Sequence, residues 1–184
     1  CLRQGPNPVL EPRGLHHWFD GDGMVHAIYF ENGKAEYRNR WVGTADLQAE
    51  RAGRDIGAGG VLLPSARSRA GSTRGDLVYK DTANTDLVFH NGSLMALWYI
   101  SGKPVRVDAR TLATIGDESF GGALPRHVSA HGKVDPKTGE FCFFDYSLYE
   151  PWMTFGVVDA QNNLTNFQKV DLPGPRLPHD LGLT

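Results

Sequence analysis

Cysteine, excess charge of one sign and long apolar runs are all scarce in this chain of 184 residues. Its two cysteines, Cys1 and Cys142, provide neither a disulfide framework nor clustered zinc ligands, so we expect a reducing, cytoplasmic compartment. The net charge is −2, from 19 basic and 21 acidic residues, and the absence of a basic stripe argues against nucleic acid as a partner. Apolar runs fall far short of the roughly 20 residues that span a bilayer. We therefore expect neither a membrane span nor a signal peptide.

Glycine and proline, in contrast, are plentiful, with 22 and 11 residues that separate many short β-like runs. Two Asn-Gly pairs, at 32–33 and 91–92, favour type I′ turns, which require positive φ angles at both positions. The pattern predicts four hairpins: 24–30 with 34–42, 86–90 with 93–99, one turning at 135–139, and 155–159 with 164–170. Hairpins recurring in this way predict an all-β fold, either as blades of a β-propeller or as a sandwich.

The length of the chain allows one domain with a sizeable core. The chain begins at Cys1 without an initiator Met and stops at Thr184 where a strand is expected to begin. We therefore expect residues 1–184 to form part of a larger domain, truncated at both ends. A short helix is predicted over 45–52. The segment 50–75, rich in Gly, Ala, Ser and Arg, is typical of a surface loop, with a functional lid as the alternative.

Six strings of residues, in order along the chain, resemble the motifs of the carotenoid cleavage oxygenase family. The first is Leu-Arg-Gln-Gly-Pro-Asn-Pro at 2–8, and the second is His-Trp-Phe-Asp-Gly-Asp-Gly-Met at 17–24. The others are Tyr-Arg-Asn-Arg-Trp-Val at 37–42, Thr-Ala-Asn-Thr at 82–85, Ser-Ala-His at 129–131 before Val-Asp-Pro at 134–136, and Pro-His-Asp at 178–180. Because they keep the family's order, the resemblance covers essentially the whole chain.

The resemblance implies a seven-bladed β-propeller that holds a non-haem Fe(II) through four histidines. His131 and His179 match the first two of these ligands, and the second pair belongs further along than Thr184. Neutral imidazole suits Fe(II), and four such ligands leave coordination positions open for O₂. The implied activity is oxidative cleavage of a conjugated C=C bond of a carotenoid or apocarotenoid to two carbonyl products. Its partners are therefore an apolar polyene and O₂.

Thr85 aligns with a threonine that, in relatives, points its methyl group at an open iron position and restricts access. The same residue type is equally typical of an ordinary β-branched position near a strand. For Thr85 the resemblance therefore implies a catalytic-site role, whereas the residue by itself requires none.

The chain departs from the family pattern at Tyr99, where relatives carry a Glu that is hydrogen-bonded to a ligand histidine. A carboxylate partner orients the imidazole and raises its basicity, and its loss typically weakens metal affinity or activity about 10- to 100-fold. Three alternatives follow: Tyr99 supplies a weaker acceptor, another acid takes the place of the Glu, or the site is altered.

A second departure concerns the substrate. Stilbene-cleaving relatives bind a phenol with a Lys and a Tyr, but Trp98 occupies the position of that Lys, and the loop 63–72 contains no Tyr. These differences disfavour a 4-hydroxystilbene and favour an apolar polyene. Peripheral membrane contact for uptake of such a substrate stays open.

The other histidines match no ligand position of the family; they are His16, His17, His26, His90 and His127. Two other functions stay open. An iron-free propeller would act as a binding protein for lipophilic ligands, and Tyr99 is the feature that supports it. A retinoid isomerase or stilbene-cleaving relative would keep the fold and change the reaction.

Overall fold

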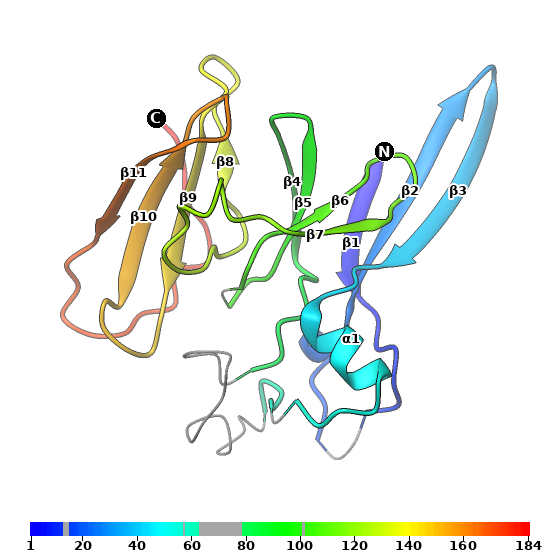
Figure 1. Cartoon of the computed structure of the whole chain (residues 1–184), viewed down its shortest axis with the longest axis horizontal. Helices are drawn as coiled ribbons and strands as arrows, with labels where there is room; N and C mark the ends of the chain where they lie inside the picture. Colours follow the sequence, from blue (N-terminus) through cyan, green and yellow to red (C-terminus); the bar gives the residue numbers. More distant parts are fainter. Residues whose placement is uncertain (13–14, 57, 63–78, 101) are drawn as a thin grey trace.

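Three antiparallel sheets make up the described part of the chain, residues 1–12, 15–56, 58–62, 79–100 and 102–184 of the computed structural model (Figure 1). The strand orders are β1-β2-β3, β4-β5-β6-β7 and β11-β10-β9-β8. The prediction of an all-β fold is confirmed. The predicted loop 50–75 lies partly, and the loop 63–72 entirely, outside the described residues. The strands are β1 (Leu2–Pro6), β2 (Gly23–Glu31), β3 (Lys34–Trp41), β4 (Asp86–His90), β5 (Ser93–Leu97), β6 (Val105–Val107), β7 (Thr114–Asp117), β8 (Lys133–Val134), β9 (Phe141–Tyr146), β10 (Met153–Val158) and β11 (Leu164–Lys169).

Both Asn-Gly pairs form the tight turns predicted for them. Asn32 and Gly33 have φ angles of 50° and 73°, and they join β2 to β3. Asn91 and Gly92 have φ angles of 43° and 73°, and they join β4 to β5. Positive φ at both central positions matches the right-handed twist of the flanking strands, which is why this dipeptide specifies a hairpin locally.

The other two predicted hairpins also form, β8–β9 and β10–β11. In the first, the Gly139 N–H donates to the Asp135 carbonyl over 2.8 Å, and Gly139 has a φ of 76°. In the second, Asn162 takes a φ of 71°. Small or Asx residues at these positions avoid the steric penalty that positive φ imposes on most side chains.

The predicted short helix is α1 (Ala45–Arg51), and one 3-10 turn, η1 (Trp18–Asp20), precedes β2. Thr44 caps α1, because its hydroxyl accepts a hydrogen bond from the Leu47 N–H over 3.1 Å. Leu47 is fully buried and anchors the helix. Among the described residues, no helix is long and apolar enough to cross a membrane.

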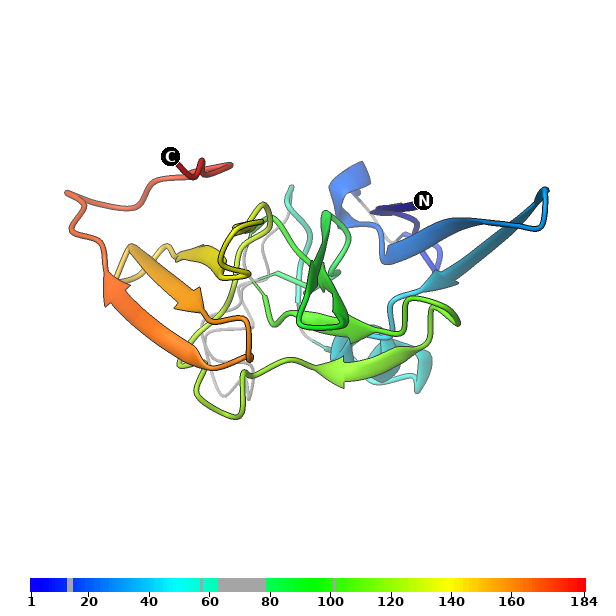
Figure 2. The same cartoon turned by 90° about the horizontal axis from the view of Figure 1, so that it is seen from above.

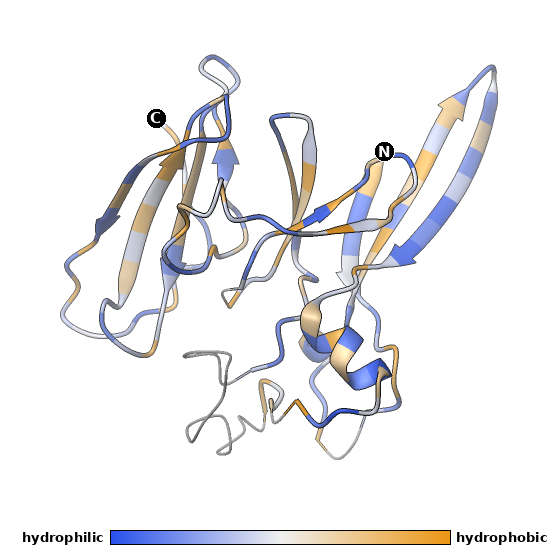
Figure 3. Cartoon of the chain, viewed as in Figure 1, coloured by the Kyte–Doolittle hydropathy of each residue, from blue (hydrophilic) through white to orange (hydrophobic). Residues whose placement is uncertain are grey.

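The three sheets lie side by side in both views, and two apolar clusters pack between them (Figures 1 and 2). The strands β3 and β11, at the two outer edges, are largely hydrophilic (Figure 3). Such polar edges are typical of strands that face solvent. The first cluster joins the β1–β3 sheet to the β4–β7 sheet and includes Val25, Ala27, Leu94, Ala96 and Val105. The second joins the β4–β7 sheet to the β8–β11 sheet and includes Met95, Leu97, Val128, Phe141 and Phe143.

The end of β5, in the second sheet, is hydrogen-bonded to the segment that leads into the third sheet. β5 stops at Leu97, two residues before the predicted end, because Trp98 forms a bridge with Ser129 on the neighbouring segment. The Ala130 N–H donates to the Trp98 carbonyl over 2.9 Å, and the Ser129 hydroxyl donates to the Tyr99 carbonyl over 2.8 Å. These bonds place the residue that follows Ala130 where the two sheets meet.

Candidate metal centre

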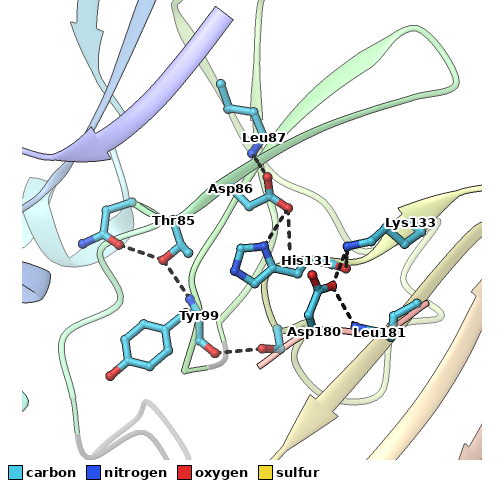
Figure 4. A network of polar contacts seen from close by, with 10 residues as sticks. Thr85, Asp86, Leu87, Tyr99, His131, Lys133, Asp180 and Leu181 are labelled. Carbon is cyan, nitrogen blue, oxygen red and sulfur yellow. Dashed lines mark hydrogen bonds and ion pairs between the residues drawn. The ribbon is translucent and has the colours of Figure 1, made fainter. Parts of the chain in front are cut away.

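His131 lies at that junction, two residues before the start of β8, and charged groups hold its backbone on both sides (Figure 4). Its N–H donates to Asp86 Oδ2 over 3.1 Å, and its carbonyl accepts from Lys133 Nζ over 2.7 Å. Its φ is 70°, in the left-handed region that few residues other than glycine adopt. The backbone contacts therefore hold His131 in a conformation that it would seldom take unaided.

The two ring nitrogens of His131 have different surroundings. Nδ1 lies 3.6 Å from Asp86 Oδ2, whereas Nε2 is buried and has no hydrogen-bond partner among the described residues. Leaving a buried polar atom unpaired is costly, so an unpaired imidazole nitrogen suggests a missing ligand. Metal-binding histidines commonly direct one nitrogen to the metal and the other to a carboxylate. Here Nδ1 faces the Asp86 carboxylate at 3.6 Å, longer than a hydrogen bond, and the described residues leave Nε2 free for a metal. His131 therefore fits a transition-metal site.

His179 reaches the same place from the segment that follows β11. This segment runs back towards β8 and β9 (Figures 1 and 2). The imidazole of His179 stacks on that of His131, with ring centroids 4.9 Å apart and an interplanar angle of 25°. The structure thus brings together the two histidines that the sequence predicts as iron ligands.

Lys133 connects the two histidine-bearing segments, because its Nζ donates to both the His131 carbonyl and Asp180 Oδ1. The Asp180 carboxylate also accepts from the Leu181 N–H over 2.7 Å. The hydrogen bond from Lys133, with that from Leu181, holds the pKa of Asp180 below its ordinary value.

The described residues supply two imidazoles and stop short of a complete ligand set. Within the described ranges, no group of three or more His, Cys, Asp or Glu side chains is arranged to hold a metal ion. A stable centre would therefore need ligands from outside these residues.

Thr85 immediately precedes the carboxylate that contacts His131, and its hydroxyl is used twice. It donates to Asn84 Oδ1 over 2.9 Å and accepts from the Tyr99 N–H over 3.0 Å. Two hydrogen bonds to one hydroxyl fix the side-chain rotamer, so the methyl group of Thr85 has a defined direction.

Tyr99 occupies an aromatic environment. Its ring packs against Phe19 and Trp98, at centroid distances of 5.6 and 6.3 Å. Burial, with smaller contributions from Tyr79 and Asp20, raises the pKa of its hydroxyl. The acid beside His131 is Asp86, which the sequence motifs do not indicate. Its place directly after Thr85 was the only available signal, because 45 residues separate it from His131.

Three other histidines have structural contacts elsewhere. His17 Nδ1 accepts from the Phe19 N–H and caps η1, and His26 Nδ1 lies 2.6 Å from the Tyr37 hydroxyl. His90 is buried and packs against Phe141 with ring centroids 5.9 Å apart. Both ring nitrogens of His90 are buried without a hydrogen-bond partner among the described residues, and that none of the three is a ligand stays a prediction.

The side-by-side antiparallel sheets and the paired imidazoles define the class of this protein: a β-propeller with a candidate metal centre between two blades. The profile of the family described as "Retinal pigment epithelial membrane protein" matches residues 1–184. The chain therefore belongs to this family, that of the carotenoid cleavage oxygenases, and the predicted family is confirmed.

Curated relatives carry oxygenase names. The chain is 34% identical over 197 residues to carotenoid 9,10(9',10')-cleavage dioxygenase 1 of Arabidopsis thaliana, covering 100% of this chain and 36% of the relative. It is 32% identical over 186 residues to isoeugenol monooxygenase of Pseudomonas nitroreducens, covering 99% and 38%. The chain thus spans well under half the length of these relatives.

Solved structures confirm the predicted fold class, part of a β-propeller. The lignostilbene dioxygenase of Pseudomonas brassicacearum superposes with a TM-score of 0.79 at 30% identity, over 97% of this chain and 37% of that one. The cobalt-substituted apocarotenoid oxygenase of Synechocystis gives a TM-score of 0.74 at 32% identity, over 100% and 40%.

Proposed function

We propose that this chain belongs to an Fe(II)-dependent dioxygenase that cleaves a conjugated C=C bond of a carotenoid or apocarotenoid to carbonyl products. In this proposal His131 and His179 are two of the iron ligands. The observation that carries it is the stacked imidazole pair, 4.9 Å between centroids, with the Nε2 atom of His131 buried and unpaired. Membership of a family that includes named carotenoid cleavage dioxygenases supports the reaction type.

The residues around the pair are suited to holding a transition metal such as iron. Imidazole is a ligand type that Fe(II) accepts, and a bound Fe(II) with open positions would supply the site of O₂ activation. The chain's own contribution is rigidity, because Asp86 and Lys133 fix the backbone of His131 and Lys133 also holds Asp180 beside His179. A cobalt-substituted structure among the relatives supports a metal-binding site in this fold.

Thr85 is proposed to restrict access to the metal with its methyl group. Its hydroxyl is occupied by Asn84 and Tyr99, so the methyl group cannot exchange places with it without breaking both hydrogen bonds. The side chain would therefore act as a fixed apolar wall.

Trp98 supports an apolar substrate. Its side chain is 2% exposed and packs edge-on against Tyr79, at a centroid distance of 6.3 Å. An indole at this position offers no positive charge to a phenolate, and its burial adds to the apolar character of this part of the molecule. Relatives named for isoeugenol and lignostilbene make a phenolic alkene the alternative substrate class.

The decisive experiment uses the full-length protein of which this chain is part. Purified protein is expected to contain iron in a 1:1 ratio and to convert an apocarotenal to two carbonyl products under ¹⁸O₂, with label in at least one product. His131→Ala and His179→Ala should each abolish both iron content and turnover. His26→Ala, whose imidazole contacts Tyr37 instead, is the matched control and should change neither.

The alternatives make different predictions in the same experiment. A lipophilic-ligand binding protein would bind the apocarotenal without iron and without turnover. A retinoid isomerase relative would give product without label from ¹⁸O₂. Faster turnover of a 4-hydroxystilbene than of any apocarotenal would replace the proposed substrate class.

A further inference from the structure

Asp86, the first residue of β4, has a carboxylate that is fixed by its own strand and directed at His131. Its Oδ1 atom accepts from the Leu87 N–H over 2.9 Å. Its Oδ2 atom accepts from the His131 N–H over 3.1 Å and lies 3.6 Å from His131 Nδ1 (Figure 4). One side chain thus contacts both the backbone and the ring of the candidate ligand.

The position of this carboxylate has a consequence for the imidazole. A carboxylate facing Nδ1 favours the tautomer that carries its proton on Nδ1, and this leaves the lone pair on Nε2. Nε2 is the buried nitrogen without a partner among the described residues. The acid therefore favours the ring form that a metal ion requires at Nε2.

The backbone of His131 needs the same support. Its φ of 70° is a conformation that costs a non-glycine residue of order 1–3 kcal/mol and persists only where the surroundings impose it. His131 lies in a turn, and the next residue is Gly132, where a Cβ atom would lie 2.5 Å from the ring of Phe141. The Asp86 hydrogen bond to the His131 N–H is one of the contacts that hold this turn.

We propose that Asp86 is a positioning residue for His131, through its hydrogen bond to the His131 N–H and its position facing Nδ1. The inference rests on the proposed function in that it takes His131 to bind a metal. This acid differs from the family's Glu in its position in the chain. Asp86 begins β4 and follows Thr85, whereas the residue in the position of the Glu is Tyr99, whose ring packs against Phe19. Asp86 acts through His131 and does not itself touch metal or substrate.

The test measures metal affinity independently of turnover. Full-length protein is stripped of metal and titrated with Co(II), following the visible absorption bands that report both affinity and coordination geometry. Asp86→Ala should raise the Kd for Co(II) about 10- to 100-fold. Asp86→Asn should raise it less, because the amide oxygen can still accept from the His131 N–H while the charge is lost. Asp117→Asn, on β7 of the same sheet and paired with Lys103, is the matched control and should bind as wild type does.

The outcomes separate this inference from the proposed function. If His131→Ala binds Co(II) as tightly as wild type, the proposed function fails. If His131→Ala is weakened while both Asp86 variants keep a Kd within about twofold of wild type and an unchanged spectrum, the positioning role of Asp86 is overturned and the proposed function stands. Thermal unfolding of the metal-free proteins accompanies each titration. Should Asp86→Ala fail to fold, Asp86→Asn decides by the same twofold criterion.

Discussion

Lys133 Nζ and Asp180 Oδ1 lie 2.5 Å apart, and this ion pair ties the segment that carries His179 to the strand that follows His131. Lys133 also donates to the His131 carbonyl, so a single ammonium group contacts both histidine-bearing segments. The two segments also meet through the imidazole stack of His131 and His179. Lys133 therefore contributes to the spacing of the two candidate ligands.

Removing this tie should weaken metal binding while leaving the sheets intact. Both side chains are partly exposed, at 38% and 56%, so the effect is expected to be modest. Lys133→Met should raise the Kd for Co(II) roughly two- to fivefold. Lys137→Met, in the exposed turn after β8, is the control and should have no effect. Equal affinities for Lys133→Met and wild type in a titration would show that the imidazole pair needs no such tie.

Substitutions of Thr85 should separate its methyl group from its hydroxyl. Thr85→Val keeps a methyl group and loses the hydrogen bonds to Asn84 and Tyr99, so we expect a loss of about 1–3 kcal/mol in unfolding free energy. Thr85→Ser keeps the hydroxyl and lacks the methyl group. It should fold normally and change the KM for O₂ or the product pattern. Denaturant unfolding and oxygen-electrode kinetics measure the two effects, and a Ser variant identical to wild type in turnover would remove Thr85 from the site.

Trp98 should determine the substrate class. Trp98→Phe keeps an aromatic face and is expected to retain most turnover of an apocarotenal. Trp98→Ala removes a side chain that is 2% exposed, and such truncations typically cost about 3–5 kcal/mol of stability. Its apocarotenal KM should rise at least tenfold, measured on the folded fraction. A Phe variant with no activity, alongside normal stability, would indicate that the buried indole N–H is needed for catalysis.

The dependence of the unfolding free energy on alkaline pH should reveal the contribution of Lys80 and its two carboxylate partners, Asp22 and Glu50. Lys80 Nζ lies 2.6 Å from both Asp22 and Glu50. Burial by itself would lower the pKa of Lys80, but these two carboxylates outweigh it and raise the pKa above its ordinary value of 10.5. A pKa raised by folding contributes stability that is complete below the unfolded pKa and is lost as the pH rises through the folded pKa.

The stabilisation by Lys80 is therefore expected to be constant at neutral pH and to decline above about pH 10.5. The unfolding free energy of Lys80→Met should be lower than that of wild type by of order 3 kcal/mol at pH 7, because the substitution leaves the buried Asp22 carboxylate without its cation. This difference in unfolding free energy should become smaller above pH 10.5. Lys103→Met, at a 61% exposed side chain, is the control. A gap that stays constant from pH 8 to pH 12 in urea unfolding would contradict this account.

The 184-residue chain by itself is expected to bind iron weakly and to show no cleavage activity. The described residues bring together two imidazoles, and the chain spans 36–40% of its relatives. Comparison of its iron stoichiometry and turnover with those of the full-length protein provides the check. Stoichiometric iron with cleavage by the short chain would show that its own residues complete the site.

The hairpins, the short helix and the family were all predictable from the sequence, because their signals are local. Asn32-Gly33 and Asn91-Gly92 accept positive φ whatever surrounds them, and Thr44 caps its own helix. Linear motifs likewise identified His131 and His179 as a pair, although their role as ligands stays a prediction.

The tertiary structure alone decided which groups surround that pair. Nothing local indicates that Asp86 reaches His131 across 45 residues, or that Lys133 reaches Asp180 across 47. The end of β5 at Leu97 was also mispredicted, since the bridge from Trp98 goes to Ser129, on the segment that precedes β8 and lies 31 residues further along the chain. Turn chemistry acts through the φ and ψ angles of adjacent residues, whereas the environment of an imidazole depends on how separate sheets pack. For that reason the sequence determined the hairpins and the candidate ligands, and only the packing of the sheets determined their partners.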